Sequence, residues 1–214
     1  MKRSFDIFFA LVALSLLAVP FIAIAFSTKL SSRGPVFFRQ LRMGRGGKPF
    51  WLYKFRTMYV NEGGSLVTME GDPRITPVGR VLRRWKLDEL PQLWNVLTGD
   101  MSVIGPRPEV ERYVAHYTPE QRHLLEQTPG LAGLSQLVYP HEADLLRRCA
   151  NAEEFYVRQL MPKKIAVDLE YEARRTFWSD LQLLYEMALM IVGRSYRVDR
   201  QFCVVPPEKG TPSK

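Results

Sequence analysis

Two adjacent carboxylates, Asp88 and Glu89, are the residues of this sequence best placed to do chemistry. Basic residues precede them, and Arg107 stands between two prolines downstream. An ionised aspartate can attack phosphorus and form an acyl phosphate, and a second carboxylate can hold Mg²⁺ together with substrate phosphates. Nearby positive groups lower the pKa of a carboxylate and neutralise a phosphoryl group in transfer. The cluster therefore indicates phosphoryl transfer, and a helix cap formed by Asp88 is the structural alternative.

Short elements must position these side chains. The sequence predicts a basic helix over residues 78–85 and a second helix over 89–97, with the carboxylates between them. Two strands over 35–42 and 49–56, joined by a glycine-rich turn, predict a basic β-hairpin. Further helices are expected over 109–128, with a break at Pro119, and over 152–171, with a break at Pro162. A last helix over 180–192 is apolar almost all round, which fits either a core helix or a helix against lipid.

The N-terminal segment 5–26 carries a single charge, Asp6, and as a helix it would be ~33 Å long, enough for a hydrocarbon core of ~30 Å. A signal peptide, a straight transmembrane helix and a re-entrant helix all fit this composition. Pro20 favours a bend within the segment. Because basic residues flank both of its ends, and such residues favour the cytoplasmic side, a re-entrant helix fits better than a straight span.

Composition narrows the class of protein. The chain has 214 residues, of which 46% are hydrophobic and 24% charged, so a disordered chain is excluded. Two cysteines cannot form a disulfide scaffold, and the three histidines show no metal-ligand spacing. Eight of the positive charges that give a net charge of +8 lie between Lys29 and Asn61, a stretch without any acidic residue. Such a stretch indicates an anionic partner: nucleic acid, lipid headgroups or a phosphorylated substrate.

Several motifs together resemble the bacterial sugar transferase family, the monotopic phosphoglycosyl transferases that start glycan assembly on a polyprenol phosphate. The resemblance covers about residues 2–193. The most specific match is LDELPQLWNVLTGDMS at 87–102, followed by GPRP at 105–108. The other matching stretches are residues 2–6, 34–40, 53–58, 72–76, 129–136 and 177–180.

The resemblance implies a mechanism and a set of partners. Asp88 would attack the sugar-linked phosphorus of a UDP-sugar, UMP would leave, and polyprenol (undecaprenyl) phosphate would accept the sugar phosphate. Glu89 would bind Mg²⁺, and Lys54, Arg83 and Arg107 would bind phosphates. The other implied partners are membrane lipid and downstream glycosyltransferases, with no nucleic acid, at the cytoplasmic face of a bacterial inner membrane.

The expected architecture is a mixed α/β, helix-rich chain with interfacial amphipathic helices. It divides into a re-entrant membrane helix at 1–32, a catalytic domain at 33–197 and a disordered tail at 198–214. The sequence departs from the family pattern at Val19, where the family bend has serine before proline, at Lys86, where serine is common, and at Thr128, where arginine is common. Residues 139–142 also differ where the sugar or nucleotide is expected, so the sugar stays open. The alternative to an enzyme is a membrane-tethered nucleic-acid-binding or scaffold protein that uses the aromatic residues of the basic hairpin.

Overall fold

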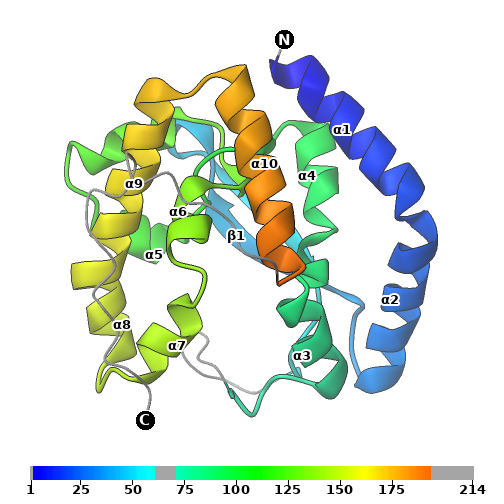
Figure 1. Cartoon of the computed structure of the whole chain (residues 1–214). Helices are drawn as coiled ribbons and strands as arrows, with labels where there is room; N and C mark the ends of the chain where they lie inside the picture. The colour runs from blue at the N-terminus through cyan, green and yellow to red at the C-terminus, as the bar shows by residue number, and fades with distance from the viewer. Residues whose placement is uncertain (1, 61–70, 194–214) are drawn as a thin grey trace.

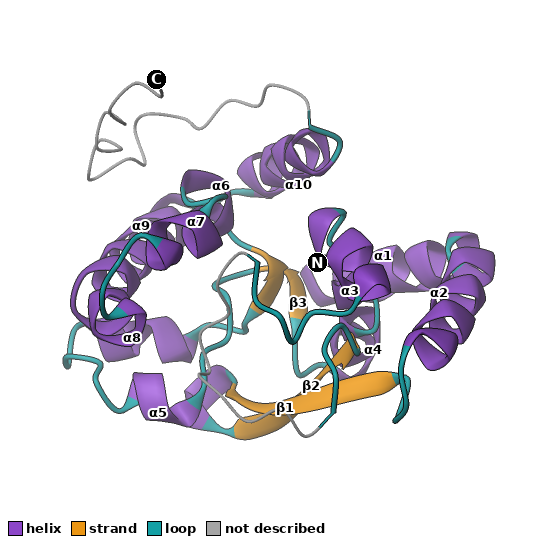
Figure 2. Cartoon of the chain, turned by 90° about the horizontal axis from the view of Figure 1, so that it is seen from below, coloured by secondary structure: helices purple, strands orange, loops and turns teal. Residues whose placement is uncertain are grey.

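The computed structural model describes residues 2–60 and 71–193, and shows the mixed α/β, helix-rich fold that the sequence predicts (Figure 1). Two small two-stranded sheets lie among the helices in this part of the chain (Figure 2). The tail expected over 198–214 and the last residues of the expected catalytic domain, 194–197, lie outside the described residues.

The N-terminal segment forms two helices, α1 (Lys2–Leu16) and α2 (Ala18–Ser31), which meet at Leu17 with a bend of 66°. Pro20 has no N–H for the carbonyl of Leu16, four residues earlier, so the helix loses a hydrogen bond at the bend. The next bond, from the Phe21 N–H to the Leu17 carbonyl, is intact at 2.8 Å. Within the described residues no one helix is long and apolar enough to cross a bilayer, and only the bent pair together meets that test. The predicted bend is confirmed.

Helix α1 is joined to the rest of the protein by two polar residues as well as by its apolar side chains. Asp6 is buried, and its Oδ1 accepts hydrogen bonds from Ser102 Oγ at 3.0 Å and from the Val103 N–H at 2.9 Å. The Arg3 guanidinium donates to the carbonyls of Val96 and Leu97, near the end of α4 (Gln92–Thr98), so α1 runs beside α4 (Figure 1). The one charge within the apolar run thus faces protein, which explains how a segment otherwise suited to lipid carries it.

The basic hairpin consists of strands β1 (Phe37–Met43) and β2 (Pro49–Phe55), which pair antiparallel with Leu41 opposite Trp51. A turn that includes the 3₁₀ segment η1 (Arg45–Gly47) joins them. Buried Asn95 fixes the hairpin to α4: its Nδ2 donates to the Trp51 carbonyl at 2.7 Å, and its Oδ1 accepts from the Tyr53 N–H at 3.2 Å. The predicted hairpin is confirmed.

A second sheet pairs β3 (Ser102–Ile104) in parallel with β4 (Gly130–Ala132), as Ser102 opposite Gly130. Nothing in the sequence predicted this pair, because strands of three residues are too short to show a period. The two backbones approach closely: a Cβ on Gly130 would lie 2.0 Å from the Gly105 nitrogen. Glycine is therefore required at residue 130, and the residues after β3 are held against β4.

The remaining helices differ in part from expectation. Over 109–128 the predicted break at Pro119 is confirmed, but the helical segments on its two sides are shorter than predicted: α5 (Glu111–Val114) and the 3₁₀ helix η3 (Gln121–Glu126). The chain lacks a continuous apolar stripe there that would support longer helices. Pro162 does not interrupt the helix expected over 152–171. It lies in the first turn of α9 (Met161–Arg174), where its missing N–H is tolerated, and α8 (Ala152–Phe155) and a π turn, η4 (Tyr156–Leu160), lead into it.

Helix α10 (Phe177–Ile191) starts three residues before its predicted start, because the Thr176 side chain accepts a hydrogen bond from the Ser179 N–H and caps it. One face buries Leu183 and Met187, whereas Trp178 and Tyr185 are exposed. The apolar helix is therefore packed on one side and open on the other, rather than fully buried. Two short helices, α6 (Leu134–Val138) and α7 (Glu142–Arg147), follow β4.

Two apolar clusters form the core of the described chain. The larger one brings together α1, α4, the β3–β4 pair, α6, α9 and α10, and includes Val96, Val103 and Val167. The smaller one lies under α5, η3 and the α8–α9 region and includes Tyr113, Leu146 and Tyr156. Because α9 contributes to both clusters, it ties the two halves of the protein together.

Candidate active site

The carboxylates Asp88 and Glu89 lie in a 3₁₀ turn, η2 (Leu87–Glu89), between α3 (Pro77–Arg84) and α4. Lys86, just before the turn, has a φ of 55°, a left-handed conformation that is uncommon for a residue other than glycine. Helix α4 begins after Pro91 without any side-chain cap. The structural alternative, in which Asp88 serves as a helix cap, is therefore wrong, since the helix starts too late for it.

Glu89 is buried between two cations that come from distant parts of the chain. Its Oε1 lies 2.8 Å from Lys54 Nζ, on β2, and 2.7 Å from Arg107 Nη2. Burial alone would raise the pKa of Glu89, but Arg107 and Lys54 outweigh it and hold the pKa well below its ordinary value of 4.5. Glu89 is thus ionised, and the triad carries a net charge of +1.

Asp88 is buried too, but it lacks the two cations that bind Glu89. Its Oδ1 is inaccessible to solvent and has no hydrogen-bond partner among the residues that the structure describes. Burial raises the pKa of Asp88 above its ordinary value of 3.8, although the charges of Lys54 and Arg83 oppose the shift. The sequence-based expectation that the neighbouring cations lower this pKa is therefore wrong, because desolvation exceeds their attraction and the nearest cations bind Glu89 instead.

Arg83, on α3, faces the same region. Its Nε donates to Thr57 Oγ1 at 2.8 Å. Burial lowers the pKa of Arg83, and the charge of Asp88 opposes this shift. All five residues singled out from the sequence therefore belong to one site: Lys54, Arg83, Asp88, Glu89 and Arg107.

Arg107 owes its position to a backbone segment that is bonded on both sides. On one side, the Gly105 N–H donates to the Ala132 carbonyl at 2.9 Å, and the Gly130 N–H donates to the Pro106 carbonyl at 2.8 Å. On the other side, Arg42 Nη1, from β1, donates to the Pro108 carbonyl at 2.9 Å. Sequence reasoning missed Arg42, because its charge looked like one of many in the basic stretch.

Magnesium is implied by the family resemblance, so the donor set has to be compared with what the ion prefers. Among residues 2–60 and 71–193, no three His, Cys, Asp or Glu side chains come together as a ready-made metal site. Mg²⁺, however, is usually held by one or two carboxylates plus substrate phosphates. Glu89 is an ionised carboxylate, and its Oε1 binds Lys54 and Arg107 in this structure, so it can supply one ligand of the ion when a phosphorylated substrate supplies the others.

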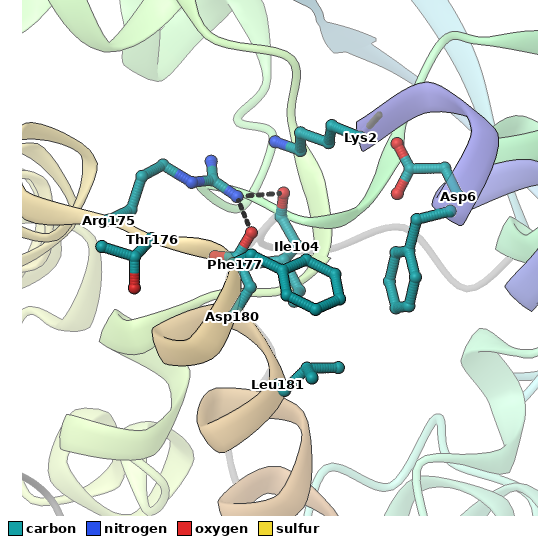
Figure 3. Close-up of a pocket in the computed structure, with 9 residues that line it drawn as sticks. Lys2, Asp6, Ile104, Arg175, Thr176, Phe177, Asp180 and Leu181 are labelled. Carbon is teal, nitrogen blue, oxygen red and sulfur yellow. Dashed lines mark hydrogen bonds and ion pairs between the residues drawn. The ribbon is translucent and has the colours of Figure 1, made fainter.

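A cavity of about 240 Å³ lies elsewhere, between the starts of α1 and α10 (Figure 3). It is lined by Lys2, Phe5, Asp6, Ile104, Arg175, Thr176, Phe177, Asp180 and Leu181. Arg175 Nη2 donates to Asp180 Oδ2 at 2.7 Å and to the Ile104 carbonyl at 3.5 Å across it. None of the five site residues lines this cavity, whereas Arg107 lines a smaller hollow of about 20 Å³ together with Pro106, Pro108 and Glu109.

Comparisons with known proteins indicate the family of the chain. A family model described as bacterial sugar transferase matches residues 1–194. The chain is 40% identical over 195 residues to a UDP-glucose:undecaprenyl-phosphate glucose-1-phosphate transferase of Escherichia coli (strain K12), and 39% identical over 188 residues to a protein of the same name from Caulobacter vibrioides. It is 38% identical over 192 residues to a UDP-N-acetylgalactosamine-undecaprenyl-phosphate N-acetylgalactosaminephosphotransferase of Aeromonas hydrophila.

Each of these three alignments covers 86% of this chain. They cover 39% of the Escherichia coli protein, 66% of the Caulobacter protein and 42% of the Aeromonas protein. The chain therefore spans between about two fifths and two thirds of the length of these relatives.

Proposed function

Since the chain belongs to the bacterial sugar transferase family, we propose that it moves a sugar-1-phosphate from a UDP-sugar to undecaprenyl phosphate, through a covalent intermediate on Asp88. The observation that carries this proposal is the contrast between two adjacent carboxylates. Glu89 is bound by two cations, whereas Asp88 keeps a buried oxygen without a hydrogen-bond partner in the described structure. No cation of the described residues forms an ion pair with Asp88, so its carboxylate can act as the nucleophile.

In the first step, a carboxylate oxygen of Asp88 forms a bond to the phosphorus that carries the sugar, and the bond from that phosphorus to the bridging oxygen breaks. The bridging oxygen leaves with its electron pair as part of UMP. In the second step, an oxygen of undecaprenyl phosphate attacks the same phosphorus, and the carboxylate of Asp88 is released. Neither step consumes a proton or an oxidant, and burial favours the reaction because an ionised oxygen without hydrogen bonds is more nucleophilic than a solvated one.

The site cations supply the electrostatic part of catalysis. Lys54, Arg83 and Arg107 are fixed by the hairpin, α3 and the 105–108 segment, so they can hold the donor phosphates without reorganisation. Glu89 would hold Mg²⁺ together with the donor phosphates, and the ion would neutralise charge on the transferred group. The net positive charge of the Lys54–Glu89–Arg107 triad favours an anionic diphosphate over a neutral ligand.

The same proposal places the enzyme in a membrane, with α1 and α2 as a re-entrant helix and both ends on the cytoplasmic face of a bacterial inner membrane. The support is the exposed apolar surface along both helices, where Phe8, Leu16, Val19 and Phe26 are each more than 60% exposed. A surface of this kind is unusual for a protein in water. Trp178 and Tyr185 on the open side of α10 suit the interface with lipid headgroups.

The alternative function, nucleic-acid or scaffold binding through the basic hairpin, has less support. Several of its cations bind protein: Lys54 pairs with Glu89, Arg42 bonds to Pro108, and Arg56 donates to backbone carbonyls near the end of α2. Three of the eight cations of the basic stretch are therefore used inside the fold, and the five that are exposed are Lys29, Arg33, Arg39, Arg45 and Lys48.

The test uses the full chain in detergent with undecaprenyl phosphate, Mg²⁺ and a panel of UDP-sugars, and it measures UMP release. A panel is needed because the relatives are named for both glucose and N-acetylgalactosamine. We expect UMP release with at least one donor, and an aspartyl-phosphosugar adduct on Asp88 by mass spectrometry when the acceptor is left out. Asp88→Asn should abolish both, whereas Asp100→Asn, the same change at an exposed position, should abolish neither. UMP release by Asp88→Asn at the wild-type rate would refute the proposed nucleophile.

A further inference from the structure

Glu109, two residues after Arg107, is the centre of a second polar cluster behind the site. Its Oε1 accepts a hydrogen bond from Tyr156 Oη, and its Oε2 lies 3.4 Å from Arg42 Nη1. The Glu109 carbonyl also accepts from the Met43 N–H at 2.8 Å. The side chain is only 11% exposed, so these bonds are shielded from water. The cluster therefore anchors the chain directly after Arg107.

Tyr156 reaches this cluster from an unusual backbone. It is the first residue of the π turn η4, and π turns are rare and frequently occur at functional sites. Its buried ring lies 5.3 Å from Lys164 Nζ, and Lys164 in turn pairs with Glu142 at 2.8 Å. Through Tyr156, the part of the fold that leads into α9 is thus connected to Glu109, two residues after Arg107.

We infer that Tyr156 and Arg42 are positioning residues, which act through Glu109 and the Pro108 carbonyl to fix Arg107 where it meets Glu89 and the donor phosphates. Arg42 holds the Pro108 carbonyl, and β4 holds Pro106, so the backbone on each side of Arg107 is bonded. The position of a guanidinium that must meet both a carboxylate and a phosphate is sensitive to small shifts of its backbone. This inference rests on the proposed function, because it assigns these residues to the donor step.

The structure offers a matched pair of variants. Tyr156→Phe removes the hydroxyl that binds Glu109 and keeps the ring. Tyr113→Phe removes a hydroxyl that is buried without a hydrogen-bond partner in the described structure, on a ring whose centroid is only 5.0 Å from that of Tyr156. Both changes delete one oxygen from the smaller apolar cluster of the core, but only Tyr156→Phe removes a hydrogen bond to Glu109.

The measurement is the UMP burst without acceptor, as a function of UDP-sugar concentration, which isolates the donor step. We expect Tyr156→Phe to raise the donor KM about tenfold, the factor that corresponds to about 1.4 kcal/mol. The KM for undecaprenyl phosphate, measured in the complete reaction, should stay unchanged. Tyr113→Phe should leave the donor KM at its wild-type value. Arg42→Lys keeps a cation that can reach the Pro108 carbonyl, and it should retain more donor affinity than Arg42→Ala.

Two results would overturn the inference. The first is an equal donor KM for Tyr156→Phe and Tyr113→Phe. The second is a loss of activity in Tyr156→Phe that lowers kcat alone and disappears at a temperature where the variant is fully folded. If the wild-type protein releases no UMP, the proposed function fails by itself. Calorimetric binding of UDP then decides the inference: about tenfold weaker binding to Tyr156→Phe than to the wild type supports it, and equal binding or no binding by the wild type refutes it.

Discussion

The two adjacent carboxylates should affect the stability of the protein in opposite directions. Glu89→Gln removes the negative charge between Lys54 Nζ and Arg107 Nη2, which lie 2.8 Å and 2.7 Å from the same oxygen. The glutamine can accept a hydrogen bond from one of them, but the two cations then repel each other in a largely buried site. Removing one partner of such a buried ion pair costs about 3–5 kcal/mol, and we expect about 3 kcal/mol here because the side chains of Lys54 and Arg107 are 18% and 26% exposed.

Asp88→Asn, at the next residue, should have the opposite sign. The carboxylate is buried, its Oδ1 has no hydrogen-bond partner in the described structure, and its pKa is raised by burial. Replacing a desolvated charge by a neutral amide of the same shape should therefore raise the free energy of unfolding, by about 1 kcal/mol. Activity should be lost in both variants, so a loss of activity does not distinguish them, whereas stability does.

The assay is urea unfolding in detergent at pH 7, followed by tryptophan fluorescence, with Asp100→Asn as the control for an exposed aspartate. We expect the midpoint of Glu89→Gln to fall, that of Asp88→Asn to rise slightly, and that of Asp100→Asn to stay near the wild type. If Asp88→Asn unfolds as readily as Glu89→Gln, then Asp88 has stabilising partners and the assignment of the two roles is wrong.

Three further predictions concern the scaffold of the site. Asp168 accepts a hydrogen bond from Ser135, and burial raises the pKa of its carboxyl group from 3.8 to about 6. The stability that this group contributes is complete below pH 3.8 and is lost as the pH rises through 6. The total loss is up to about 3 kcal/mol. Asp168→Asn keeps the contacts but has no carboxyl group to titrate. The free energy of unfolding of this variant, relative to that of the wild type, should therefore increase between pH 4 and pH 7 in urea titrations. A difference that does not change with pH would contradict the raised pKa of Asp168. Asn95→Ala should cost about 2–3 kcal/mol, because it leaves backbone groups of β2 unpaired; hydrogen exchange at Tyr53 should speed up, and unchanged protection would argue against this link. Pro20→Ala restores a helical hydrogen bond, so spin labels at the outer ends of α1 and α2 should move apart by double electron–electron resonance, and an unchanged distance would mean that packing, not proline, sets the bend.

Some features of the fold follow from local sequence. The strands of the hairpin, the glycine turn between them and the bend near Pro20 all depend on residues within a few positions of each other. The motifs around Asp88 and Arg107 likewise predicted the candidate site residues, since each lies within a short, distinctive stretch. Local patterns failed where the elements were short, as for the β3–β4 pair, or where prolines divided a polar segment, as over residues 109–128.

Only the tertiary structure decided how the site residues are paired. Glu89 meets Lys54, 35 residues earlier, and Arg107, 18 residues later, and this choice leaves Asp88 without a cation in contact. The sign of the Asp88 pKa shift follows from the same packing, because desolvation depends on every segment that covers the group, whereas a sequence shows only the charges nearby along the chain. The sequence therefore indicated which residues to expect at the site, and the fold determined which of the two carboxylates is bound by cations.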